Sequence, residues 1–160
     1  MNQATIDKLL SSAKRIIETV PLIQIPNHGS QSRIELKDGE YLFYVDLNRS
    51  GHKKPKCTYQ LRESVQKDKI LLRLDLVGRT HKNPPGDFEL AESDIPCPHM
   101  HIANEKLGTS IAYPLDHEYV KMFLKEEELE NLIFVFKTFL NKCIVTNTNE
   151  YDFELQDQLF

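Results

Sequence analysis

The sequence contains no apolar run close to the roughly 20 residues that a membrane-spanning helix needs, which predicts a protein without a membrane partner. Its first ten residues, MNQATIDKLL, lack the apolar core of a secretory signal peptide. Cysteine is also scarce, because Cys57, Cys97 and Cys143 are odd in number and far apart. These cysteines predict reduced thiols in a cytoplasmic protein rather than a disulfide framework or a CxxC metal site.

Several common functional motifs are missing as well. We find no Walker loop, no GxGxxG run, no HExxH run and no clear helix-turn-helix pattern. These absences argue against the protein classes that such motifs define. What remains is a chain of 160 residues with 40% hydrophobic and 28% charged residues, an ordinary globular composition. Its length predicts one domain over residues 1–145, followed by an acidic tail or loosely docked edge over residues 146–160.

Hydrophobic periodicity predicts an α+β fold. Apolar residues recur with helical spacing near both ends of the chain, and they alternate with polar residues between them. We therefore expect a single antiparallel sheet of about four to six strands, arranged as a meander, with an N-terminal and a C-terminal helix packed on one face. The expected helices are residues 3–19 and 126–142, and the expected strands are residues 33–37, 41–48, 56–65, 70–77, 99–102 and 110–114. Residues 78–98 are expected to form a long loop, and such loops are often functional.

Charge is unevenly distributed along the chain. Residues 49–82 hold 10 lysines and arginines against 3 acidic residues, whereas the rest holds 10 against 21. A basic middle between acidic ends predicts a local anion-binding surface on an otherwise acidic protein. The residues expected to contact nucleic acid are Arg62, Lys56, Lys54, Arg79 and Lys82.

Five residues are predicted to share one polar patch. Because side chains alternate along a strand, Arg73 and Asp75 point to one side, and so do His99 and His101. His81 lies at the start of the long loop, close enough to join them. The face that carries these residues is expected to be the one opposite the helices.

This set suits metal-independent cleavage of RNA. One imidazole takes the proton of the 2′-hydroxyl and a second protonates the leaving 5′-oxygen, since histidine titrates near neutral pH. His99, His101 and His81 are the candidates for these roles. Arg73 would neutralise the charge that develops on phosphorus, and Asp75 would orient a histidine or Arg73.

Other interpretations of the same residues remain open. His99 and His101, with His81 or Asp75, form the three-ligand set of a catalytic zinc site, which predicts a metal-dependent hydrolase. The Arg73–Asp75 pair is also compatible with a purely structural ion pair. A third hypothesis is a non-catalytic inhibitor of a host defence complex, in which the acidic surface competes with nucleic acid.

The motifs also carry a resemblance. The runs Leu72–Asp75, His81–Pro84 and Pro98–Ile102 resemble a group of small bacterial and phage proteins of uncharacterised-domain type. They are distantly similar to the TumE-type toxins of toxin-antitoxin operons. The resemblance covers about residues 56–114 and singles out Arg73, Asp75, His81, His99 and His101. It implies a toxin-like or mobile-element protein that acts on RNA, with a cognate antitoxin or a host defence protein as its partner.

Overall fold

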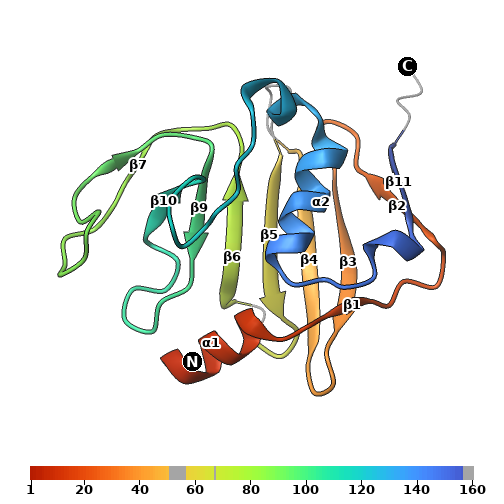
Figure 1. The fold of residues 1–160 in the computed structure, drawn as a ribbon, viewed down its shortest axis with the longest axis horizontal. Helices are drawn as coiled ribbons and strands as arrows, with labels where there is room; N and C mark the ends of the chain where they lie inside the picture. The colour runs from red at the N-terminus through yellow and green to blue at the C-terminus, as the bar shows by residue number, and fades with distance from the viewer. Residues whose placement is uncertain (51–56, 67, 157–160) are drawn as a thin grey trace.

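The computed structural model describes residues 1–50, 57–66 and 68–156. Its elements confirm an α+β fold, and α1, β9 and α2 overlap the regions expected to form them (Figure 1). In chain order they are α1 (Gln3–Ser11), β1 (Arg15–Ile16), β2 (Leu22–Ile25), β3 (Gln31–Lys37), β4 (Leu42–Asn48), β5 (Thr58–Glu63), β6 (Ile70–Asp75), β7 (His81–Lys82), β8 (Asp94–Ile95), β9 (His99–Ile102), β10 (Ala112–Pro114), the 3-10 turn η1 (Glu126–Glu130), α2 (Leu132–Lys142), the 3-10 turn η2 (Thr148–Glu150) and β11 (Asp152–Leu155).

The main sheet is larger than the four to six strands expected. Over the described residues it has seven antiparallel strands in the order β1-β3-β4-β5-β6-β9-β10. Strands β3 to β6 form the expected meander, and β9 continues it after the excursion that carries β7 and β8. The extra strand is β1, whose residues fit the helical pattern that predicts a longer N-terminal helix.

The N-terminal helix therefore ends at Ser11 rather than at residue 19. A buried amide explains the early end. The side chain of Asn147 accepts a hydrogen bond from the Ile16 N–H at 2.8 Å and donates one to the Ile16 carbonyl at 3.0 Å. Ile16 also pairs with Leu36 of β3. The sheet edge and this amide satisfy the backbone groups that a longer helix would have used.

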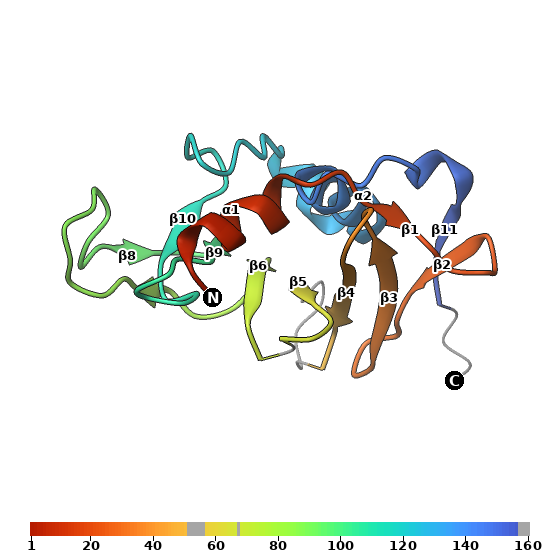
Figure 2. The same ribbon diagram turned by 90° about the horizontal axis from the view of Figure 1, so that it is seen from below.

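Both helices cover the same face of the sheet, as expected (Figure 2). The core lies between them and the inward-facing residues of the strands. Tyr59 of β5 stacks on Phe136 and Phe139 of α2 with ring centroids 5.2 and 5.9 Å apart, and its hydroxyl donates to the Leu132 carbonyl. The second helix begins at Leu132 rather than at residue 126, because the side chain of Asn131 caps the N–H of Phe134 and a 3-10 turn precedes it.

Two small pairings lie beside the main sheet. Strand β11 pairs in parallel with β2, so part of the acidic C-terminal segment is a docked strand. Strands β7 and β8 pair within residues 78–98, where a loop without strands was expected, and they form an arm beyond β9 and β10 (Figure 1). Neither helix in the described ranges has the length and apolar character that crossing a membrane requires.

Candidate functional site

The sheet register places the predicted polar residues in two rows. On the adjacent strands β6 and β9, Asp75 lies opposite His99, and Arg73 lies opposite His101. The alternate residues of these strands, Leu74 and Met100, are fully buried on the helix-covered side. The side chains of both rows therefore emerge on the opposite face, as the period-two pattern predicted.

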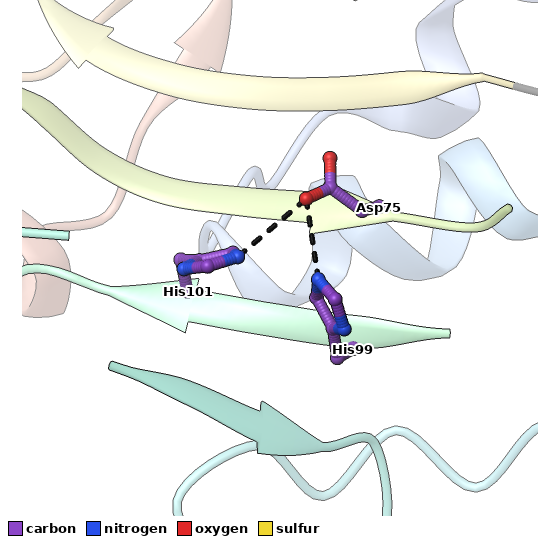
Figure 3. A group of neighbouring side chains, drawn as sticks. All are labelled: Asp75, His99 and His101. Carbon is purple, nitrogen blue, oxygen red and sulfur yellow. Dashed lines mark ion pairs between the residues drawn. The ribbon is translucent and has the colours of Figure 1, made fainter. Parts of the chain in front are cut away.

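The two histidines point at one carboxylate oxygen (Figure 3). The Nε2 atom of His99 lies 3.3 Å from Oδ2 of Asp75, and the Nε2 atom of His101 lies 3.5 Å from the same oxygen. One nitrogen or oxygen ligand atom from each of the three residues falls within 4.8 Å of the others. We call these three residues the triad.

Backbone carbonyls hold the other nitrogen of each ring. Nδ1 of His99 lies 3.1 Å from the Ile95 carbonyl, and Nδ1 of His101 lies 2.7 Å from the Thr109 carbonyl. A carbonyl only accepts hydrogen bonds, so each Nδ1 carries the donated proton. Each ring therefore presents its Nε2 atom to Asp75. Within the described chain, Nε2 of His101 is buried and has no hydrogen-bond partner.

Asp75 is ionised in this setting. Burial alone would raise its pKa, but the two imidazoles and the Arg73 guanidinium hold the pKa of the carboxyl well below its usual range. Nε of Arg73 lies 3.2 Å from Oδ2, and the Thr58 hydroxyl donates to Oδ1 at 3.2 Å. The carboxylate is thus a concentrated negative charge in a partly dry pocket.

His99 responds to that charge. Burial alone would lower its pKa, but the hydrogen bond to Asp75 and the contact with the Cys97 thiol raise the pKa to about 10. The Cys97 sulfur lies 3.7 Å from Nδ1 of His99. The His99 ring is therefore protonated at neutral pH.

Both rings are enclosed. Only 2% of His99 and 1% of His101 is exposed to solvent. His81 of β7 contributes to this cover, with its ring centroid 4.7 Å from that of His101. Its Nε2 atom is 2.6 Å from the Ser110 carbonyl. The structure thus brings His81 beside the triad as expected, but Asp75, rather than His81, completes the set of converging ligand atoms.

A polar groove opens next to the triad on the same face of the sheet. Its volume is about 660 Å³, and the residues that line it come from β3, β4, β5 and β6: Gln31, Ser32, Arg33, Asp46, Asn48, Thr58, Gln60, Arg62, Arg73 and Asp75. The side chains of Arg73 and Asp75 are 32% and 20% exposed. They connect this groove to the enclosed histidines.

A second carboxylate, Asp46 of β4, lines the groove two strands away from Asp75. Asp46 accepts hydrogen bonds from Nε of Arg33 at 3.0 Å, from Nε of Arg62 at 2.6 Å and from Gln60 at 3.1 Å. The guanidinium carbons of Arg33 and Arg62 also lie 4.5 and 5.3 Å from the centre of the Tyr44 ring. The ends of three guanidinium groups and two carboxylates therefore share this surface.

The described residues that were expected to contact nucleic acid lie in two places. Arg62 lines the groove, whereas Arg79 and Lys82 are exposed on the arm that carries β7. Lys54 and Lys56 lie outside the described residues. Arg33 and Asp46 were not among the residues predicted from the sequence. The hairpin turn at residues 38–41 could have revealed them, because it sets the register in which Arg33 lies opposite Asp46.

Comparison with known proteins identifies one family. A family model described as "Family of unknown function (DUF6978)" matches residues 1–145 and so includes the whole candidate site. The comparisons with curated proteins and with solved structures gave no match.

Proposed function

Because the chain belongs to this family of unknown function, membership assigns no activity, and we propose from the geometry that the protein is a hydrolase of phosphodiester bonds with RNA as its substrate. One observation carries the proposal. The Asp75–His99–His101 triad adjoins a groove that three guanidinium groups line. This combination places a reactive centre beside a surface that attracts anions.

The charges of the groove suit a phosphodiester. Arg33, Arg62 and Arg73 contribute three positive charges, whereas Asp46 and Asp75 contribute two negative ones. Guanidinium groups bind phosphate oxygens in a planar, two-point geometry, and they stay charged at every physiological pH. Arg73 is the best placed of the three, because it also contacts Asp75 of the triad at 3.2 Å.

Burial bears on the chemical role of the histidines. In the metal-independent route expected from the sequence, an imidazole must approach within hydrogen-bonding distance of a 2′-hydroxyl. His99 and His101 are almost fully enclosed, so that route requires the cover around His81 to move. Enclosure supports a role in which the two rings position Asp75 at the edge of the groove. Asp75 and Arg73 would then lie nearest to the substrate.

A cleavage assay tests the proposal. Purified protein is incubated with end-labelled single-stranded RNA and single-stranded DNA, with and without chelator. We expect RNA cleavage that Arg73→Gln lowers by about 100-fold, a typical loss for one group that stabilises transition-state charge. Arg15→Gln is the matched control, because Arg15 is an exposed arginine on the edge strand β1, paired with Glu150. The proposal would be contradicted if the protein cleaved neither RNA nor DNA. Stoichiometric binding to another protein without turnover would point to an inhibitor.

The toxin-like role that the sequence resemblance implies extends the proposal to the cell. If the protein is toxin-like, its expression in a bacterial host should slow growth and degrade cellular RNA. His101→Gln, which removes one ring of the triad, should relieve both effects at equal protein levels. Growth arrest that persists in this variant would separate toxicity from the candidate site.

A further inference from the structure

We infer that Asp75, His99 and His101 bind a divalent transition-metal ion, with zinc the best match, through Oδ2 of the aspartate and Nε2 of each histidine. The inference concerns metal binding alone. It goes beyond the proposed function, and it does not depend on RNA being the substrate.

The distances within the triad are those of a metal site. Zinc lies about 2.0–2.1 Å from histidine nitrogen, so two ligand atoms at tetrahedral positions are roughly 3.4 Å apart. The two Nε2–Oδ2 distances are 3.3 and 3.5 Å. All three ligand atoms lie within 4.8 Å of one another. Two edges of the coordination polyhedron are therefore already formed.

The hydrogen bonds around the rings prepare them as ligands. A metal-binding histidine usually donates its other N–H to a carbonyl or carboxylate, which fixes the tautomer and aims the free lone pair. Both rings follow this arrangement, with Nδ1 held by the carbonyls of Ile95 and Thr109. The pairing of β9 with β6 and β10 does not require two such side-chain contacts, so they are a separate sign of ligand orientation.

The buried Nε2 atom of His101 needs a partner. Its ring is 1% exposed, and the nitrogen has no hydrogen-bond partner within the described residues. A hydrogen bond from Nε2 of His99 to Oδ2 of Asp75 leaves the His101 nitrogen facing the same oxygen at 3.5 Å without a hydrogen bond of its own. A divalent ion satisfies the Nε2 lone pairs of both rings and the carboxylate together.

The site has an open side. Asp75 and Arg73 are partly exposed to the groove, whereas both histidines are enclosed. Catalytic zinc sites typically have three protein ligands and leave one position for water or substrate. Arg73 competes for the same oxygen, with Nε 3.2 Å from Oδ2. Metal binding is therefore expected to release the Arg73 guanidinium towards the groove, where an anion would meet it.

The donor atoms narrow the choice of metal. Two imidazoles and one carboxylate suit zinc and the neighbouring transition metals, whereas magnesium and calcium prefer all-oxygen sites. Cys97 lies against His99, but it is not part of the group of converging ligand atoms in the described chain. The ligand set is thus two nitrogens and one oxygen.

Titration of the untagged protein tests the inference. The chain is stripped with chelator and dialysed, then titrated with Zn²⁺ in a calorimeter and with Co²⁺ in a spectrophotometer. We expect one ion per chain and a visible Co²⁺ spectrum of low coordination number. His101→Gln and Asp75→Asn should each weaken Zn²⁺ binding by at least about 100-fold. Loss of a residue that only hydrogen-bonds to a metal ligand already costs about 10–100-fold in affinity.

His117→Gln is the matched control. His117 packs on Tyr113 and Tyr119, outside the triad, and its loss should leave the zinc affinity unchanged. Thermal unfolding in chelator shows whether each variant folds. Nitrogen NMR of the wild-type histidines provides a test that needs no variant, because Zn²⁺ should shift the Nε2 resonances of two rings only.

Three results would overturn the inference. They are no zinc binding by the wild type, equal binding by His101→Gln, and unchanged Nε2 resonances on addition of Zn²⁺. These results are distinct from failure of the proposed function. Zinc binding without RNA cleavage supports the metal site and contradicts the hydrolase, whereas RNA cleavage without zinc binding does the reverse.

Discussion

Two carboxylates on the same face of the sheet have contrasting partners. Asp46 on β4 is surrounded by guanidinium and amide donors from Arg33, Arg62 and Gln60. Asp75 on β6 faces two imidazoles, although Arg73 also contacts it. In both cases the surroundings lower the carboxyl pKa despite burial. Both carboxylates are thus ionised and mostly buried, with side chains 17% and 20% exposed.

The difference between them is chemical. A guanidinium group is always protonated and has no lone pair, so the Asp46 cluster can be stable only as an ion pair. An imidazole can give up its proton and offer a lone pair, so the Asp75 cluster can exchange protons for a metal ion. We therefore assign a structural and anion-binding role to the Asp46 cluster and a reactive role to the triad.

The largest expected effect separates the two carboxylates by activity. Asp75→Asn removes the charged ligand and should lower RNA cleavage by at least about 100-fold, as expected for loss of a group at the reacting centre. Asp46→Asn changes the same atoms two strands away, and it should lower cleavage by less than about tenfold. Initial rates of RNA cleavage measure both. Equal losses would show that the two clusters act as one.

A second prediction concerns stability, for which we expect the larger effect in the Asp46 cluster and the smaller one at the triad. Arg62 is 10% exposed in its side chain and contacts Asp46 at 2.6 Å. Arg62→Gln leaves that carboxylate without its closest partner, and it should lower the free energy of unfolding by about 2–3 kcal/mol, slightly less than for a fully buried pair. Urea denaturation measures the change. Arg73→Gln should cost less, and a larger cost there would reverse the assignment of roles.

The Asp46 cluster should also depend on pH. Because Arg62, Gln60 and Arg33 lower the pKa of Asp46 against the effect of burial, the ionised form favours the folded state. The stabilisation is complete above the unfolded pKa of about 3.9, and it is lost as pH falls through the lower folded pKa. The stability difference between wild type and Asp46→Asn should thus be larger at pH 7 than at pH 3. A stability difference as large at pH 3 as at pH 7 would contradict this reasoning.

The smallest effect is expected at the exposed end of the same cluster. The Arg33 side chain is 47% exposed, although its Nε lies 3.0 Å from Asp46. Solvent screens such a pair, so Arg33→Gln should cost at most about 1 kcal/mol. Added salt should reduce the cost further. Urea denaturation at low and high salt measures both, and a cost equal to that of Arg62→Gln would mean that exposure does not govern these pairs.

Much of the candidate site could be predicted from the sequence because it depends on period-two alternation. Arg73 and Asp75 share one side of a strand, and so do His99 and His101, in any sheet that buries Leu74 and Met100. His81 was also correctly placed near them. The N-terminal helix was overextended because Ile16 fits a helical stripe, whereas the contact that ends the helix comes from Asn147, 131 residues later.

The sequence by itself determined the α+β class and which residues share the polar face, since both follow from local hydrophobic period. Only the tertiary structure decided that β6 and β9 are neighbours across residues 76–98, which brings Asp75 within 3.3 Å of His99. It also decided that both rings are buried and that backbone carbonyls hold their Nδ1 atoms. Contacts between segments far apart in the chain leave no periodic signal, because they depend on strand order and register.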